Sequence, residues 1–147
     1  MQSTPTKLVR QTYTTECGAA CVAMLAGVGI RKARSLLGMN STQRARRTSP
    51  EDIRRALAEA GLVLGRETWT SNWHNVAKQT QPVLVALNYR PKDLTNGRDC
   101  YVWHWAVYDP RRKTRPLLDP QSKSSPRDPG RSVLSSYFKV LQHGDAP

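Results

Sequence analysis

The order of the apolar patterns along the chain is its most constraining feature. In the second half, two runs rich in Val, Leu, Tyr and Trp, residues 82–89 and 101–108, have the composition of buried β-strands. In the first half, apolar residues instead recur every three or four positions, as in amphipathic helices. Helices that precede strands predict an α+β fold, in which N-terminal helices pack on one side of an antiparallel sheet.

Four helices are expected before these two strands. The expected ranges are 18–26, 30–37, 50–60 and 70–79. The first is almost wholly apolar and rich in small residues, so it should be buried. The third has a well-defined start, because Ser49 suits the N-cap position and Pro50 the first helical position. Gly38 and Gly61 mark the expected ends of the second and third helices.

Three shorter strands should complete the sheet. Their expected ranges are 62–66, 115–119 and 137–141. Two stretches of loop composition, 40–48 and 120–130, are short enough to be loops within one domain. A length of 147 residues also favours a single domain, covering residues 1–147. No apolar run approaches the length of a membrane span.

The chain is strongly basic, with 23 Lys and Arg residues against 11 Asp and Glu residues and a formal net charge of +12. The positive residues are densest in residues 31–55 and 111–115. This charge predicts either an anionic partner, such as nucleic acid, a membrane surface or an acidic binding protein, or a merely solvated basic face. Neither stretch is interleaved with aromatic residues, as it would be in a single-strand nucleic-acid binder.

Three cysteines are too few, and odd in number, for a disulfide framework, and no secretory signal is visible, so we expect a reducing, cytoplasmic setting. Cys17 and Cys21 are spaced i, i+4 on the first expected helix, where β-carbons lie about 5–6 Å apart, whereas a disulfide needs roughly 3.8 Å. Together with Cys100 and His104 they would supply four zinc ligands, but this spacing is not a zinc knuckle. We therefore expect neither a metal nor a cofactor.

Cys17 is the candidate nucleophile. It lies where a polar segment enters the buried first helix, and the unpaired amides at a helix N-terminus favour the thiolate. Gly18 and Ala19 should leave room for a substrate. The alternative is that Cys17 is a small core residue, as free cysteines often are. Cys21, one helical turn further along, is most simply a core residue.

His104 is the candidate base, because a thiolate nucleophile needs an imidazole that accepts and returns a proton. On an alternating strand, His104 shares its face with Val102 and Ala106, whose small side chains would leave space for a groove. The other two histidines, His74 and His143, are expected to be exposed.

Two further side chains suit supporting roles. Asp119 closes the expected strand 115–119 and would accept the other imidazole proton and so fix the tautomer. Asp109 is the alternative acid, although Asp-Pro at its position is typical of a turn. Gln11 precedes Cys17 by six residues, and its amide would donate to an oxyanion beside the backbone N–H of Cys17.

Together these segments resemble the C39 cysteine peptidases, which are papain-like domains best known as the N-terminal part of bacteriocin-processing ABC transporters. Gln11, followed after five residues by CGAAC, resembles the family's opening motif. Residues 104–107 (HWAV) resemble its histidine motif, and residues 118–120 (LDP) its Asp-Pro motif. Residues 48–62 resemble the helix that the family places between these motifs, and residues 82–89 its first core strand. The resemblance covers most of the chain.

The resemblance implies a papain-like fold and a peptidase that cleaves a peptide or protein substrate through a Cys-His-Asp triad. Cys17 would be the nucleophile, His104 the general base and acid, Asp119 the orienting acid, and Gln11 the oxyanion donor. Papain-like scaffolds also carry deamidases and bacterial effector toxins. An alternative is therefore an effector domain, delivered into a target cell and neutralised by an acidic inhibitor protein. A second alternative is a non-catalytic basic scaffold that binds a polyanion.

Overall fold

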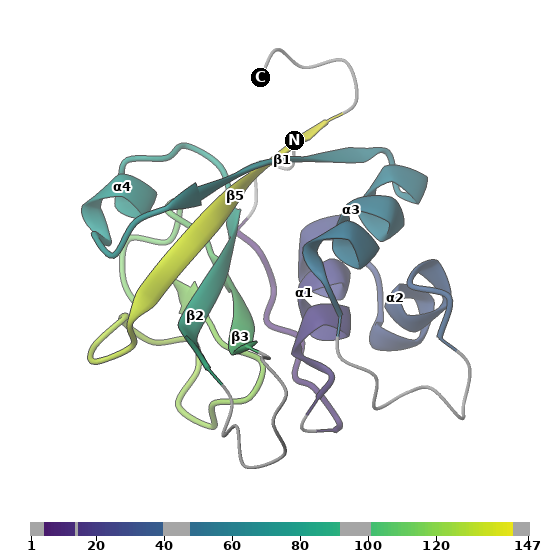
Figure 1. The fold of residues 1–147 in the computed structure, drawn as a ribbon, viewed down its shortest axis with the longest axis horizontal. Coiled ribbons are helices and arrows are strands. Elements are labelled where there is room, and N and C mark those ends of the chain that lie inside the picture. The colour runs from purple at the N-terminus through teal and green to yellow at the C-terminus, as the bar shows by residue number, and fades with distance from the viewer. Residues whose placement is uncertain (1–4, 14, 40–47, 92–100, 143–147) are drawn as a thin grey trace.

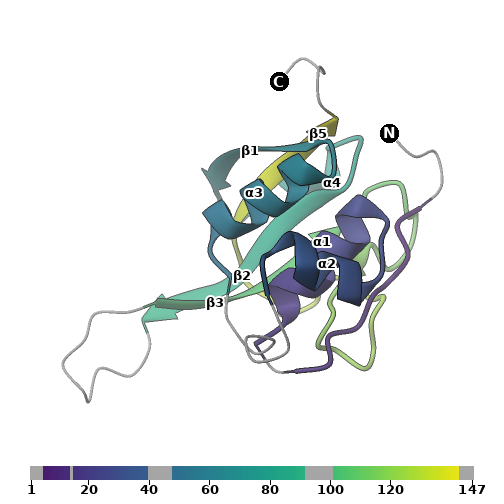
Figure 2. The same cartoon turned by 90° about the vertical axis from the view of Figure 1, so that its right-hand side faces the viewer.

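A five-stranded antiparallel sheet and a group of three helices form the two layers of the molecule (Figure 1). The structure, a computed structural model, describes residues 5–13, 15–39, 48–91 and 101–142. The helices of the first sixty residues cover one face of the sheet, as the view from their side shows (Figure 2). The predicted α+β class, with N-terminal helices on an antiparallel sheet, is confirmed.

The helices begin close to where the sequence places them. They are α1 (Cys17–Ala26), α2 (Ile30–Leu36), α3 (Pro50–Glu59) and α4 (His74–Ala77). The start of α3 is as predicted, because the Ser49 hydroxyl accepts from the N–H of Asp52 and the Asp52 carboxylate accepts from the N–H of Ser49.

The predicted helix 70–79 is wrong in extent, since only its middle forms α4. The backbone N–H of Thr70 donates to the carbonyl of Ser135 and so continues the pairing of the sheet. The side chain of Asn72 then accepts from the N–H of His74, a local turn that replaces the first helical turn. Because hydrogen bonds of the sheet and of the Asn72 side chain engage the residues before it, the helix begins only at His74.

The strands are β1 (Leu62–Trp69), β2 (Val83–Pro91), β3 (Tyr101–Tyr108), β4 (Leu117–Leu118) and β5 (Leu134–Gln142). Their order in the sheet is β1-β5-β2-β3-β4. The β1 and β5 strands are longer than predicted, because they pair with each other along their length through a register shift at Leu64/Glu67. The β4 strand is shorter than predicted, because Arg115 takes a φ of 49°, which is incompatible with a strand.

Of the two stretches with loop composition, the structure describes the second in full and only the last residue of the first. Residues 40–47 of the first lie outside the described residues. Residues 120–130 form a loop as predicted, with one isolated bridge between Arg127 and Leu117.

Helix α1 is the central element of the core. Its residues Cys17 to Met24 are all buried, as the apolar composition predicts. Their small side chains let α1 lie close against β3, where Trp105 and Val107 face the helix. The indole of Trp105 also packs on Phe138 of β5, with ring centroids 5.8 Å apart. The opposite face of the sheet buries a second apolar cluster beneath α4.

A buried ion pair fixes the segment that leads into α1. Glu16, wholly buried, accepts from Arg34 of α2 with Nε–Oε2 and Nη2–Oε1 distances of 2.6 and 2.9 Å. The same carboxylate accepts from the backbone N–H of Thr12 at 3.0 Å. A carboxylate without water needs such partners, so this pair holds the turn before Cys17 against the helical layer.

We expect Arg34→Ala to destabilise the fold by about 3–5 kcal/mol, because it leaves the Glu16 carboxylate buried without its counter-ion. Urea unfolding measures the loss. Arg55→Ala is the matched control, since Arg55 pairs with Asp52 on the exposed side of α3 and should cost less than about 1 kcal/mol. Equal losses in the two variants would contradict the structural role of the Glu16–Arg34 pair.

Candidate active site

Cys17 is the first residue of α1 and lies directly against strand β3. Its residue surface is 8% exposed, and its Sγ accepts from the backbone N–H of Trp105 at 3.5 Å. The N–H groups of a first helical turn have no acceptor within the helix. The thiol therefore lies in a region of positive electrostatic potential made by backbone amides, as the sequence predicts.

His104 precedes Trp105 on β3 and is brought next to Cys17. Its Nε2 lies 2.6 Å from Oδ1 of Asp119. Burial disfavours the charged imidazole, but hydrogen bonds to Asp119 and to Cys17, together with the negative charges of both, outweigh it and raise the pKa of His104 to about 9. Because Nε2 is used by Asp119, Nδ1 is the ring atom left for the thiol.

Asp119 follows β4 and is held by donors on both carboxylate oxygens. Oδ1 accepts from His104 and from the backbone N–H of Gln121, at 3.0 Å. Oδ2 accepts from Nη2 of Arg127 at 2.9 Å. Burial alone would raise the pKa of Asp119, but the hydrogen bond and charge of His104, with these other donors, hold it well below the ordinary value.

Asp109, the alternative acid, is occupied elsewhere. It is fully buried and accepts from Arg111 and from the backbone N–H of Thr6. These bonds outweigh burial and lower its pKa. The structure thus pairs His104 with Asp119 and leaves Asp109 as the anchor of the turn after β3.

Gln11 lies beside the loop that carries Asp119. Its backbone N–H donates to the carbonyl of Pro120 at 3.2 Å. Its side-chain Nε2 donates to the carbonyl of Tyr13 at 2.8 Å, while its Oε1 is buried with no partner among the described residues. An amide nitrogen carries two hydrogens, so the bond to Tyr13 leaves one N–H of Gln11 for another acceptor.

The space beside Gly18 is filled, which corrects the expectation that Gly18 and Ala19 leave room for a substrate. A β-carbon on Gly18 would lie 1.8 Å from Oγ1 of Thr48. The backbone carbonyl of Thr48 accepts from the indole N–H of Trp105 at 3.1 Å, and Ala19 is wholly buried. Gly18 is therefore needed for close packing between α1 and the segment before α3.

Thr48 and Arg127 are the contacts that the sequence did not reveal. Both lie at or within stretches of loop composition, and no spacing rule says which loop residue will reach a site.

The other cysteine and histidine predictions have the following outcomes. Cys21 is a wholly buried core residue, as predicted, and burial raises its pKa well above the ordinary value. His74 is exposed as predicted, whereas Cys100 and His143 lie outside the described residues.

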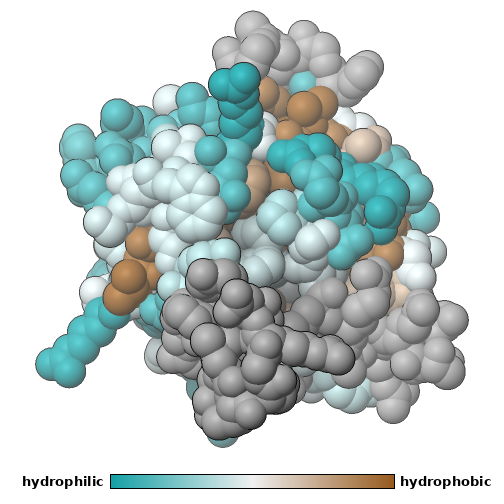
Figure 3. All heavy atoms as spheres, in the orientation of Figure 1, coloured by the Kyte–Doolittle hydropathy of each residue, from teal (hydrophilic) through white to brown (hydrophobic). Residues whose placement is uncertain are grey.

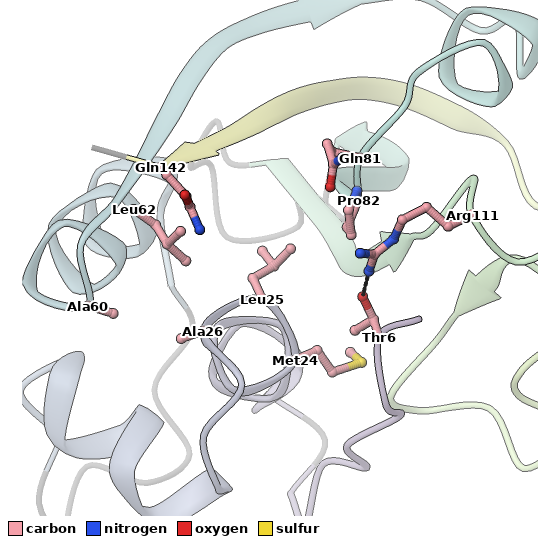
Figure 4. A pocket seen from close by; sticks show the side chains of 10 residues that line it. All are labelled: Thr6, Met24, Leu25, Ala26, Ala60, Leu62, Gln81, Pro82, Arg111 and Gln142. Atoms are coloured by element: carbon pink, nitrogen blue, oxygen red, sulfur yellow. Dashed lines mark hydrogen bonds between the residues drawn. The ribbon is translucent and has the colours of Figure 1, made fainter. Parts of the chain in front are cut away.

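A hollow of about 190 Å³ lies at the other end of α1 (Figure 4). Arg111 reaches it from the turn after β3 and donates to Thr6, but its guanidinium is already paired with Asp109. The lining includes Met24 and Leu25 of α1, about two helical turns from Cys17. This hollow is therefore separate from the group formed by Cys17, His104 and Asp119.

Two negative findings apply to the described ranges. Within residues 5–13, 15–39, 48–91 and 101–142, no three His, Cys, Asp or Glu side chains are grouped so that they could hold a metal ion. In that same part of the chain, no helix has the length and apolar character needed to cross a membrane.

Solved structures with this fold include two peptidase domains. The peptidase domain of Streptococcus ComA, a bifunctional ABC transporter involved in a quorum-sensing pathway, has a TM-score of 0.59 and 20% identity, over 93% of this chain and 98% of that domain. A double-glycine motif protease from an AMS/PCAT transporter, in complex with the leader peptide, has a TM-score of 0.52 and 15% identity, over 93% of this chain and 91% of that protease. No protein-family model and no curated protein matches the sequence. The predicted papain-like fold of C39 peptidase domains is confirmed as a fold.

We expect Gly18→Ala to destabilise the protein by about 1–3 kcal/mol, because the new methyl group would displace the Thr48 side chain from a packed position. Thermal or urea unfolding checks this value. Gly29→Ala is the matched control, since nothing lies within 4 Å of a β-carbon there. A Gly18→Ala protein as stable as the Gly29→Ala protein would show that the close approach is not required.

Proposed function

We propose that the chain is a cysteine peptidase in which Cys17 is the nucleophile, His104 the general base and acid, and Asp119 the residue that orients His104. The observation that carries the proposal is the position of His104, which interacts with Cys17 and binds Asp119 through Nε2 at 2.6 Å. Similarity in fold to two peptidase domains supports the same reaction class.

The proposed reaction is acyl transfer in two steps. The Cys17 thiolate attacks the carbonyl carbon of the scissile peptide bond, and the resulting oxyanion accepts from the backbone N–H of Cys17 and the amide of Gln11. His104 gives its proton to the leaving amine, and a thioester remains on Cys17. Water then attacks the thioester, with His104 as base, and releases the acid product and the thiol.

The electrostatics of His104 suit this role. With a pKa of about 9, the imidazole is protonated near neutral pH and is an ion-pair partner for a thiolate. The backbone amides at the start of α1 favour the negative sulfur from the other side. A proton donor for the leaving amine is thus in place before the substrate binds.

An aromatic row supports a peptide as the substrate. The face shown in Figure 3 is mostly hydrophilic, and apolar residues reach it only in small separate patches. Among large apolar residues, Trp69 and Tyr89 are 57% and 39% exposed. Ring contacts of 5.2 to 5.7 Å connect Trp69, Tyr89, Trp103 and Trp105 across the sheet. The Trp105 ring is buried, and the contact with Cys17 is made by the backbone N–H of this residue. Trp69 and Tyr89 are therefore the rings of this row that are exposed enough to contact apolar peptide side chains.

The direct test is cleavage of peptides by the wild type and by Cys17→Ala. We expect the wild type to cut a peptide carrying a double-glycine motif or proteins of a cell lysate, with new termini seen by mass spectrometry. The cleavage rate of Cys17→Ala should be lower by roughly a thousandfold or more. In Asp119→Ala the activation free energy for turnover should rise by more than the free energy of unfolding falls. A one-dalton gain without new termini would identify a deamidase instead, and equal activity of Cys17→Ala would contradict the proposal.

The pH profile provides an independent prediction. The folded pKa of His104 is raised, so the protonated form that pairs with the thiolate persists below about pH 9 and is lost above it. We expect kcat/KM to fall above about pH 9 in the wild type. In Asp119→Asn the limb should move to lower pH, because the carboxylate that favours the imidazolium is gone. An alkaline limb that stays in place in Asp119→Asn would contradict the proposed pairing.

Other expectations from the sequence have no supporting contact among the described residues. An acidic inhibitor protein, delivery into a target cell, a cytoplasmic location and a polyanionic partner stay predictions from composition and charge.

A further inference from the structure

The guanidinium of Arg127 lies on the opposite side of Asp119 from His104. Its Nη2 donates to Oδ2 of Asp119 and to Oγ of Ser132, both at 2.9 Å. Its Nη1 donates to the backbone carbonyls of Asp128 and Pro129, both at 3.2 Å. The guanidinium of Arg127 therefore donates to four acceptors, whereas an arginine in an exposed surface ion pair is mobile in solvent.

The backbone of Arg127 is fixed as firmly as its side chain. Its N–H donates to the carbonyl of Leu117 at 3.0 Å, and its carbonyl accepts from the N–H of Leu117 at 2.9 Å. Leu117 is two residues before Asp119 on the same strand end. The bridge thus places the backbone of Arg127 beside the strand end that carries Asp119, so that the guanidinium reaches the carboxylate.

Each oxygen of Asp119 has a distinct set of donors. Oδ1 faces His104 and the backbone of Gln121, whereas Arg127 is the donor that the described residues provide to Oδ2. The terminal torsion of an aspartate is soft, so a carboxylate with one unpaired oxygen rotates readily. With Oδ2 bound, rotation would break a charge-assisted hydrogen bond in a mostly buried place.

We propose that Arg127 is a positioning residue that acts through Asp119, fixing the carboxylate so that Oδ1 stays directed at His104. The inference rests on the proposed function of the Cys17 site. It adds to that site a residue that is eight positions from Asp119 in the sequence and contacts neither Cys17 nor the substrate carbonyl in the proposed reaction.

Positioning and simple charge have opposite effects on His104. A positive charge near an imidazole disfavours its protonation, so loss of charge alone would raise the pKa of His104. Loss of positioning instead frees the carboxylate, weakens its hydrogen bond to His104 and lowers that pKa. The direction of the change therefore distinguishes the two effects.

The test is titration of His104 by NMR in the wild type and in Arg127→Ala, Arg127→Gln and Arg10→Ala. Arg10 is the matched control, because it binds carbonyls of Ser122, Lys123 and Ser125 in the same loop and has no bond to Asp119. We expect a pKa of about 9 in the wild type and in Arg10→Ala. His104 should titrate at lower pH in Arg127→Ala than in the wild type. Arg127→Gln keeps an N–H donor without the charge, so His104 should titrate at higher pH in this variant than in Arg127→Ala.

An unchanged or raised pKa of His104 in Arg127→Ala would overturn the inference. If Arg127→Ala does not fold, Arg127→Met, which keeps much of the side-chain length and has no donor, is judged by the same direction of the change. In peptide cleavage, Arg127→Ala should lower kcat about tenfold with little change in KM, as expected for the outer partner of a functional side chain. Titration needs no substrate, so an inactive wild type would contradict the proposed function and leave the inference about Arg127 to be judged by the titration.

Discussion

The packing of α1 against β3 is the contact on which the candidate site depends. Small side chains along α1 allow the helix to approach the strand, and the backbone N–H of Trp105 reaches Sγ of Cys17 at 3.5 Å. His104 is the neighbouring residue on that strand, so the same contact brings the imidazole to the thiol. Catalysis as proposed would then need little motion, because the reacting groups meet across a close-packed interface.

Three buried carboxylates surround this interface, and each is paired with an arginine. Glu16 pairs with Arg34 before the nucleophile, Asp109 with Arg111 after β3, and Asp119 with Arg127 behind the imidazole. Burying a carboxylate is costly unless donors replace its water. The arginines therefore meet a structural demand of this fold, and part of the basic composition has an explanation other than an anionic partner.

The sequence was sufficient for the fold class and for the elements that carry the site. Apolar patterns located α1 and β3. The sequence also predicted that a Cys at a helix start, a His within a strand and an Asp at the end of an expected strand would meet, and the structure brings these three residues together, with the Asp just after the shorter β4. It was insufficient where tertiary contacts decide. The shortened α4 and the filled space beside Gly18 depend on segments distant in the chain. The approach of Arg127 to Asp119 depends on how the loop 120–130 folds back onto β4. No local pattern encodes such contacts.

The central claim is that His104 activates Cys17 as the nucleophile, and alkylation by iodoacetamide at neutral pH in the wild type and in His104→Ala tests this most directly. Cys17 and Cys21 lie on one tryptic peptide, so fragment-ion sequencing of that peptide assigns the alkylated residue. The account predicts that Cys17 is alkylated at least about tenfold faster in the wild type than in His104→Ala, because the imidazole is the group that activates the sulfur. Equal rates of Cys17 alkylation in the two proteins would contradict the claim.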